Sequence, residues 1–217
     1  MNHRIGVFGG TFDPIHNGHL RLAETAMMEC ELQKIIFLPA AFPPHKSPLQ
    51  LTPFRHRAEM LRLALEGRKR YEFSLIEAEL PTPTYTIDTL RSFKRSLAQS
   101  AELFFLIGID AFLEICTWKR YDELLRTVSF VVSERESNLA ERKDLLAREL
   151  NYIQEDDLWK STDGKKDVWF LRQPPLAISS SAIREAVRAG IAVHDMVPSP
   201  VHEYIMQQGL YCSQQNT

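Results

Sequence analysis

Short apolar runs alternate along the chain with longer segments in which apolar residues recur at helical spacing. A short continuous apolar run is typical of a buried strand, and a repeat every three or four residues is typical of an amphipathic helix. The runs predict strands at residues 4–8, 34–39, 71–80, 102–110, 129–134 and 168–173. The helical spacing predicts helices at residues 19–32, 52–67, 85–99 and 138–151, with Thr52 as the N-cap of the second and Gly67 just past its end.

This alternation predicts the α/β fold class: an open parallel sheet, built from right-handed βαβ units, with helices on both faces. A chain of 217 residues suits one domain with a sizeable core, so we expect a single domain over residues 1–217. The charged stretch 134–166 interrupts the alternation. We expect it to be an insertion within that domain, made of a helix and a polar loop at 161–166.

Composition narrows the function classes. Hydrophobic residues make up 44% and charged residues 25%, and the formal net charge of −2 argues against a general nucleic-acid binder. Cys30, Cys116 and Cys212 lie far apart, which argues against a disulfide framework or a zinc site. No apolar run is long enough to span a bilayer, and the first residues do not resemble a signal peptide. We expect a cytoplasmic protein with no nucleic-acid or membrane partner; the sequence leaves a homo-oligomer open.

Glycines are concentrated in the first strand-to-helix connection, which reads GVFGGTFDPIHNGHL over residues 6–20. The chain has only 9 glycines, and four of them lie within its first 18 residues. We expect the strand to end near Phe8, Gly9 and Gly10 to make the turn, and the helix to begin within residues 17–19. Ligands of an open parallel sheet bind beyond the carboxyl ends of its strands, and a helix start favours a phosphate.

Two histidines mark the same connection. His16 and His19 are three residues apart, so a helical first turn places them on one face, and Gly18 between them leaves room for a ligand. Two imidazoles can donate hydrogen bonds to the charge that develops on a transferring phosphoryl group. A lone histidine is more often a surface or core residue, but this combination after a buried strand favours nucleotidyl transfer. The chain lacks both the Gly-x-Gly-x-x-Gly and the P-loop patterns, which disfavours a dehydrogenase and a P-loop enzyme.

The segment GGTFDPIHNGH resembles the first signature of the His-x-Gly-His nucleotidyltransferase superfamily, which has a Rossmann-like sheet. The segment ISSSAIRE at 178–185 resembles its second signature, with Ser181 where threonine is commoner. The resemblance implies that both segments lie at strand-to-helix junctions on one edge of the sheet. On its own terms, Ser179 is a candidate helix N-cap and Gly190 a helix stop. Without the first signature, Arg184 would be assigned to a solvated helix surface.

Three further stretches resemble the bacterial nicotinate-mononucleotide adenylyltransferases: FPPHK at 42–46, TYTIDTL at 84–90 and GIDAFLEICTWKRYDEL at 108–124. The ending PVHEYIMQQGLY also fits, so the resemblance covers the chain apart from the insertion. One departure is VVSERES, which lacks the Arg-Pro-Gly common after that strand, although Arg135 aligns with its arginine.

This resemblance implies transfer of the adenylyl group of ATP to nicotinate mononucleotide, with release of pyrophosphate and no covalent enzyme intermediate. It implies catalytic roles for His16, His19 and Arg184. The implied ATP-binding residues are Gly9, Gly10, Thr11, Phe12, Gly18, Gly108, Asp110, Ile178, Ser179, Ser180, Ser181 and Arg184. The implied mononucleotide-binding residues are His45, Lys46, Thr86, Trp118, Lys119 and Arg135. No protein metal site is expected; Mg²⁺ should arrive on the ATP phosphates, because no carboxylate cluster offers it a cage.

For three of these positions, general chemistry supports the role that the resemblance implies. Asp110 follows a buried run, where a carboxylate can accept ribose hydroxyl hydrogen bonds, although it could equally cap a helix. Trp118 can stack on a cationic pyridine ring, although a tryptophan more often simply packs. Thr86 lies at an expected helix start, where main-chain N–H groups could bind the nicotinate carboxylate.

Two classes of alternative stay open. The nearer is a sister enzyme that adenylylates phosphopantetheine; the FPPHK segment, Trp118 and the chain length argue against it. A tRNA synthetase core is further away, because no Lys-Met-Ser-Lys-Ser-like loop is present. The other class is a catalytically silent nucleotide-binding or regulatory module, which detectable pyrophosphate release would exclude.

Overall fold

The computed structural model describes residues 3–43, 51–95, 97, 100–134, 139–172 and 176–212. Its strands are β1 (His3–Gly10), β2 (Lys34–Pro39), β3 (Tyr71–Phe73), β4 (Ala101–Gly108), β5 (Ser129–Ser133), β6 (Tyr152–Glu155), β7 (Leu158–Ser161) and β8 (Val168–Phe170). Its α-helices are α1 (Asn17–Glu29), α2 (Phe54–Leu65), α3 (Ile76–Glu79), α4 (Thr86–Arg95), α5 (Ile109–Leu113), α6 (Tyr121–Thr127), α7 (Ala140–Glu149), α8 (Ser180–Arg188) and α9 (Ser199–Gln207). A 3₁₀ turn, η2 (Ile115–Thr117), follows α5.

Within these ranges the strands form one sheet in the order β3-β2-β1-β4-β5-β8-β7-β6. The pairs from β3 through to β8 are parallel, which confirms the predicted Rossmann-like α/β class. The two strands beyond β8 pair in the antiparallel sense, which the sequence pattern did not predict. The expected all-parallel sheet is therefore extended at one edge.

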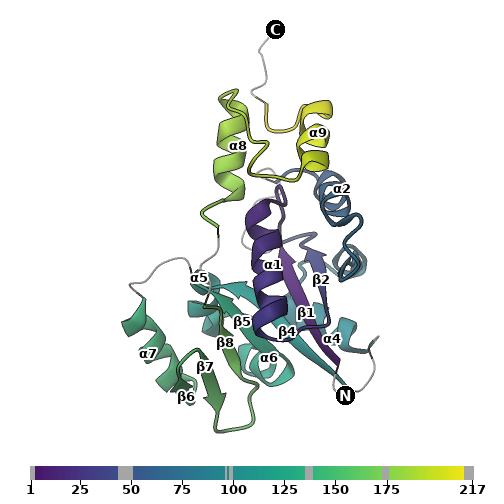
Figure 1. Cartoon of the computed structure of the whole chain (residues 1–217). Helices are drawn as coiled ribbons and strands as arrows, with labels where there is room; N and C mark the ends of the chain where they lie inside the picture. The colour runs from purple at the N-terminus through teal and green to yellow at the C-terminus, as the bar shows by residue number, and fades with distance from the viewer. Residues whose placement is uncertain are drawn as a thin grey trace.

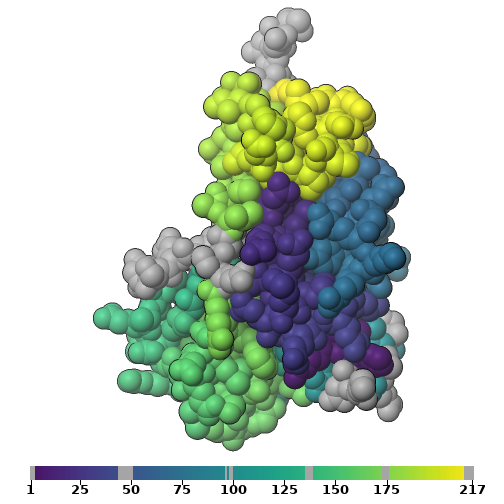
Figure 2. All heavy atoms as spheres, viewed as in Figure 1, coloured from purple at the N-terminus to yellow at the C-terminus, as the bar shows by residue number. Residues whose placement is uncertain are grey.

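Helices cover both faces of the sheet (Figure 1). In β1, Ile5 and Val7 point into one apolar cluster and Phe8 into the other, as the alternation of a strand requires. The first cluster is completed by α4, α5, α6 and α7, and the second by α1, α2, α8 and α9. Helices α8 and α9 lie at one end of the molecule, beside α2 and the start of α1 (Figures 1 and 2). The last segments of the chain therefore reach the first strand-to-helix connection.

Several predicted boundaries were wrong, among them the end of the last predicted strand, 168–173, which stops at Phe170. The run 71–80 is a strand only as far as Phe73; its second half forms α3, where the Ser74 hydroxyl accepts from the Ile76 N–H. The strand predicted at 102–110 ends at Gly108, because Ile109 already begins α5. The N-cap of α2 is Pro53 rather than Thr52, and the Thr52 N–H is taken by a tertiary hydrogen bond. Gly67 does lie past the end of α2, with φ of +76°.

The insertion joins the main core. Its predicted helix is α7, and the polar loop 161–166 follows β7, but the pattern missed β6 and β7 themselves. These strands are short, and Ile153 in β6 is exposed, so the sequence has no clear apolar alternation that predicts them. Trp159 of β7 is only 1% exposed and packs against Phe112 and Phe170. One large aromatic side chain therefore anchors the insertion to the face covered by α5.

The cysteines differ in environment. Cys30, Cys116 and Cys212 are all free thiols. Burial, with a contribution from Glu29, raises the pKa of the Cys30 thiol to about 12, so its thiolate is scarce at neutral pH.

Across the described ranges, none of the helices combines the length and apolar character that crossing a bilayer needs.

Gly6 provides the sharpest test of the core. A Cβ built on Gly6 would lie 2.8 Å from Ile35 Cγ1 and 2.9 Å from Leu32 Cδ1. Gly6→Ala should therefore lower the free energy of unfolding by about 1–3 kcal/mol through overpacking. Urea denaturation measures this loss. Gly108→Ala is the control, because a Cβ there meets no atom within 4 Å; a Gly6→Ala protein as stable as the wild type would contradict the packing.

Candidate active site

The sheet has a topological switch point at its centre. From β1 the chain proceeds to β2 and β3 on one side, and later to β4 and β5 on the other. A crevice forms beyond the carboxyl ends of the two strands that flank such a point. These strands end at Gly10 and Gly108, and they lead into the loop 11–16 before α1 and directly into α5. We call residues 11–16 the transfer loop.

Gly9 and Gly10 do not make the turn, contrary to the prediction. They are the last residues of β1 and pair with Leu38 and Pro39. A Cβ on Gly9 would lie 3.2 Å from the Phe105 ring, and one on Gly10 would lie 3.1 Å from the Phe12 ring. In this structure the two glycines therefore make room for aromatic rings. The turn itself is made by the transfer loop.

The transfer loop is bent by two unusual backbone features. Phe12 has φ of +46°, a left-handed conformation that costs energy for a residue with a Cβ, and the Asp13–Pro14 peptide bond is cis. The Phe12 side chain is only 1% exposed and packs edge-on against Phe8 and His19. The Phe12 ring is therefore held inside the fold, where it supports Phe8 and His19.

His16 and His19 face each other, as their spacing predicted. Their rings stack with centroids 3.6 Å apart, and His16 is only 1% exposed. His16 is the N-cap of α1: its Nδ1 accepts from the His19 N–H, and His19 Nδ1 accepts in return from the His16 N–H, both at 3.3 Å. An imidazole nitrogen that accepts carries no proton, so in the neutral form of each ring the proton is on Nε2. The cap thus fixes both rings as Nε2–H donors.

Asp13 ties the transfer loop to two distant segments. Its carboxylate accepts from the Thr52 N–H at 3.1 Å and from the Tyr211 hydroxyl at 2.7 Å. Asp13 is 1% exposed, so these hydrogen bonds lie out of water. Burial and the neighbouring Asp13 carboxylate both raise the pKa of Tyr211, which keeps the phenol a donor.

The second signature segment meets the first, as predicted. Arg184 Nη1 donates to the Asp13 carbonyl at 2.8 Å, and the Ser180 hydroxyl donates to the Pro14 carbonyl at 3.0 Å. Arg184 Nη2 also donates to the Ser181 hydroxyl at 3.3 Å. Two segments more than a hundred residues apart therefore form one surface beside the histidine pair.

The start of α8 has the predicted geometry. Ser179 is its N-cap and accepts from the Ala182 N–H at 3.2 Å, and Gly190 follows its end with φ of +71°. Gly18 of the first signature approaches the second: a Cβ there would lie 3.0 Å from the His16 ring, which is crowded, and 3.5 Å from the Ile178 carbonyl, which is an ordinary contact. A side chain at Gly18 would therefore crowd His16.

Residues at the end of β4 lie at the same edge of the sheet as the transfer loop, because β1 and β4 are parallel. Gly108 is the N-cap of α5 and Asp110 lies in the first turn of that helix, so the alternative role of Asp110 as an N-cap is wrong. Both residues are exposed. Within the described ranges Asp110 has no hydrogen-bond partner, and its carboxylate is open to a ligand.

A small pocket of about 160 Å³ lies between the start of α4 and the turn after η2. It is lined by residues 84–87 and 117–119, and so gathers the predicted Thr86, Trp118 and Lys119. Thr86 is the first residue of α4, as predicted, and Trp118 is half-buried with its ring edge-on to Phe105. Lys119 is held by an ion pair with Asp88 at 2.9 Å. We call this the Trp118 pocket.

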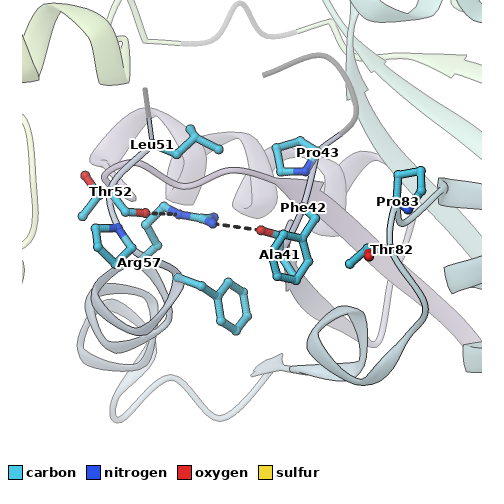
Figure 3. Close-up of a pocket in the computed structure, with 10 residues that line it drawn as sticks. Ala41, Phe42, Pro43, Leu51, Thr52, Arg57, Thr82 and Pro83 are labelled. Atoms are coloured by element: carbon cyan, nitrogen blue, oxygen red, sulfur yellow. Dashed lines mark hydrogen bonds between the residues drawn. The ribbon is translucent and has the colours of Figure 1, made fainter. Parts of the chain in front are cut away.

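A larger pocket of about 500 Å³ lies between the end of β2 and the start of α2 (Figure 3). Its walls are mainly apolar, and the Arg57 side chain runs along it between the main chain at Thr52 and at Ala41. Neighbouring segment 44–50, with the predicted His45 and Lys46, falls outside the described residues, as does Arg135.

Four polar residues at the site carry no local signal in the sequence: the buried Asp13 and Arg57 and the half-buried Glu77 and Tyr211. Asp13 stands inside the first signature, but nothing local indicates that its carboxylate is a tertiary anchor. Glu77 accepts from the Ala41 N–H at 3.3 Å and from the Thr84 and Thr89 hydroxyls. Burial raises the pKa of Glu77 despite these hydrogen bonds. It connects the end of β2 to the segment that frames the Trp118 pocket.

Sequence comparisons agree with these features. The family model described as cytidylyltransferase-like matches residues 7–186. A protein of Desulfotalea psychrophila named "Probable nicotinate-nucleotide adenylyltransferase" is 41% identical over 210 residues, which cover 96% of this chain and 99% of the relative. A Thermoanaerobacter protein of the same name is 42% identical over 208 residues, with 96% and 94% covered.

Solved structures share the fold. A "Plasmodium falciparum nicotinic acid mononucleotide adenylyltransferase complexed with NaAD" has a TM-score of 0.73 at 20% identity, covering 96% of this chain and 97% of that one. The same Plasmodium enzyme complexed with APC has a TM-score of 0.69 at 20% identity, over the same shares of the two chains. At this identity the likeness shows the fold alone.

The Asp13 anchor can be tested by stability. Tyr211→Phe removes one donor from a buried carboxylate and should lower the free energy of unfolding by about 1–3 kcal/mol in urea denaturation. Tyr121→Phe is the matched control, since the Tyr121 hydroxyl has no partner within the described ranges. Equal stabilities for the two variants would contradict the anchoring role of Tyr211.

Proposed function

The chain belongs to the cytidylyltransferase-like family and, within it, to the nicotinate-nucleotide adenylyltransferases, and from this premise we propose how its residues perform the reaction. The enzyme transfers the adenylyl group of ATP to nicotinate mononucleotide in NAD biosynthesis, forming nicotinate adenine dinucleotide and pyrophosphate. The observation that carries the assignment to this site is the stacked His16–His19 pair, joined to Arg184 through the transfer loop.

The reaction needs positioning and charge stabilisation more than covalent chemistry. A phosphate oxygen of nicotinate mononucleotide attacks the α-phosphorus of ATP in line. The bond between that phosphorus and the bridging oxygen to the β-phosphate breaks, and pyrophosphate leaves with the electron pair. No residue of the chain has to form a covalent intermediate.

His16 and His19 stabilise the transferring group in this proposal. Their Nδ1 atoms are occupied as acceptors in the helix cap, which leaves Nε2–H as the donor of each neutral ring. Donors whose orientation is fixed before the reaction require no reorganisation in the transition state. The cap of α1 therefore prepares both imidazoles for the charge that develops on the α-phosphate.

Arg184 binds the triphosphate in this proposal. A guanidinium has five N–H donors. Arg184 donates one to the Asp13 carbonyl and one to the Ser181 hydroxyl within the described ranges, and the other three could bind phosphate oxygens. The helix start at Ser179–Ser181 adds main-chain N–H groups at the same place. Asp110, exposed beyond β4, would accept from a ribose hydroxyl of ATP.

The Trp118 pocket takes the pyridine ring. Trp118, Thr86 and Lys119 line this pocket, so the indole would stack on the cationic ring, and main-chain N–H groups at the start of α4 and at Lys119 would donate to the nicotinate carboxylate. A carboxylate accepts from both donors, whereas the amide of nicotinamide mononucleotide presents an NH₂ that cannot. Acid should therefore be preferred over amide by at least about tenfold, since each unpaired donor costs roughly 1–3 kcal/mol.

Mg²⁺ enters with ATP in this proposal. Within the described residues no group of three His, Cys, Asp or Glu side chains is placed to hold a metal ion. Mg²⁺ keeps several of its waters and is bound mainly through phosphate oxygens, so it needs no cage of protein carboxylates. The ion would neutralise phosphate charge while the chain's own residues orient the two substrates.

A substrate panel tests the assignment. Purified enzyme is given ATP and Mg²⁺ with nicotinate mononucleotide, nicotinamide mononucleotide or phosphopantetheine, and pyrophosphate and the dinucleotide are measured. We expect the fastest release with nicotinate mononucleotide. Release with phosphopantetheine alone would overturn the substrate, and no release with any acceptor would overturn the reaction.

The histidines should act mainly in the transition state. His16→Asn and His19→Gln keep oxygen acceptors for the reciprocal helix cap but remove the ring donors. Each should lower kcat by about 10² or more while KM for ATP changes little. His194→Ala, at a side chain that is 65% exposed, is the matched control. A folded His19→Gln enzyme with normal kcat would remove His19 from the chemistry.

Trp118 should affect one substrate only. Trp118→Ala removes the stacking surface and should raise KM for nicotinate mononucleotide by about tenfold, a typical loss for one stacked ring. KM for ATP should stay nearly constant, because ATP binds to other residues. The acid-over-amide ratio should also stay nearly constant, because main-chain N–H groups determine it. Steady-state kinetics with both mononucleotides separate the roles. Equal losses for ATP and mononucleotide would indicate a Trp118 that only supports the structure.

A further inference from the structure

Arg57 is a buried charge whose hydrogen-bond partners are main-chain carbonyls. Its side chain is only 1% exposed. Nη1 donates to the Thr11 carbonyl at 2.8 Å and to the Ala40 carbonyl at 2.7 Å. Nε donates to the Thr52 carbonyl at 2.9 Å, and Nη2 approaches the Ala41 carbonyl at 3.5 Å. One guanidinium therefore joins the transfer loop, the end of β2 and the start of α2.

The charge of Arg57 is balanced at a distance. Burial lowers the pKa of the Arg57 guanidinium. The nearby carboxylates of Asp13 and Glu77 favour its charged form and offset part of this effect. A buried charge without a direct carboxylate partner contributes little to stability, because desolvation offsets what its hydrogen bonds gain. Its clearer consequence is geometric: the planar fork dictates where the carbonyls of Thr11, Ala40 and Thr52 must lie.

The Thr11 carbonyl is connected to the histidine pair through the next residue, Phe12. It belongs to the peptide unit that enters Phe12, the residue held at φ of +46°. The Phe12 ring packs edge-on against the His19 ring, with centroids 5.1 Å apart, and His19 stacks on His16. A change in the Thr11–Phe12 peptide would therefore move the ring that supports His19.

We propose that Arg57 is a positioning residue for adenylyl transfer, which fixes the Thr11–Phe12 peptide and through the Phe12 ring holds His19 in place. This inference rests on the proposed function. Arg57 touches neither the reacting atoms nor the histidines. A lysine at this position has one nitrogen in place of three and cannot reach all three segments, so the conservative change is also disruptive.

Kinetics of Arg57→Lys and Arg57→Gln test the proposal. Misplacing the reacting groups lowers kcat, and we expect a loss of about tenfold to a hundredfold with KM for both substrates changed by less than about threefold. Arg62→Gln is the matched control, since Arg62 lies on the same helix, is 45% exposed and pairs with Glu59. Rates are referred to folded enzyme, measured by thermal melting and gel filtration.

A double-mutant cycle tests the route through Phe12. Phe12→Leu leaves the guanidinium in place and should lower kcat by itself, which keeps the route testable if an Arg57 variant does not fold. The double variant Arg57→Lys with Phe12→Leu should be within about threefold of the slower single variant, because both changes break the same support. Losses that multiply would show that Arg57 acts independently of Phe12 and would overturn the route.

A readout independent of turnover separates this inference from the proposed function. In ¹⁵N-histidine spectra, Arg57→Lys should shift the ring signals of His19 and leave those of His194 unchanged. If the wild type forms no dinucleotide, the function fails while these spectra still decide the positioning role. An unmoved His19 signal, a normal kcat in folded Arg57→Lys, or a raised KM with unchanged kcat would each overturn the proposal.

Discussion

The reaction centre depends on how the transfer loop is held. Three of its carbonyls accept hydrogen bonds from side chains of α2 and α8: Thr11 from Arg57, Asp13 from Arg184 and Pro14 from Ser180. The Asp13 carboxylate accepts from the chain before α2 and from Tyr211 after α9. These contacts stabilise a backbone that contains a left-handed Phe12, and they leave the first turn of α1 as the place where two imidazoles can stack.

This arrangement explains why the C-terminal helices belong to the site. In Figure 1, α8 and α9 lie beyond the end of the sheet, away from most of the core. The apolar residues of both helices pack against α1 and α2, while Ser180 and Arg184 of α8 and Tyr211 after α9 reach the transfer loop. On the opposite face of the sheet, Glu77 connects the end of β2 with Thr84 and Thr89, beside the Trp118 pocket. The transfer loop and the surroundings of the Trp118 pocket are thus joined through Ala40, whose carbonyl accepts from Arg57, and Ala41, whose N–H donates to Glu77.

Sequence reasoning succeeded where a property is local. The spacing of His16 and His19 on one turn, the Ser179 cap and the Gly190 stop each depend on neighbouring residues, and each was confirmed. It failed where distant segments decide. Nothing near Asp13 indicates that its partner is 198 residues away, and nothing near Arg57 indicates that it binds Thr11. Gly9 and Gly10 were assigned to the turn because their contacts with the Phe105 and Phe12 rings are visible only in three dimensions. The last two strands of the sheet, β7 and the edge strand β6, were missed for a related reason, since burial of Trp159 rather than a repeating pattern holds them.

The helix cap orients His16 and His19 as Nε2–H donors before any substrate binds. Two-bond ¹H–¹⁵N spectra of the ligand-free enzyme at a pH where the rings are neutral measure this directly, with assignments from His16→Asn and His19→Gln. We expect Nδ1 of both rings to show the shift of an unprotonated acceptor nitrogen and Nε2 the shift of a protonated one. Protonated Nδ1 in either ring, or rapid exchange between the two tautomers, would contradict it.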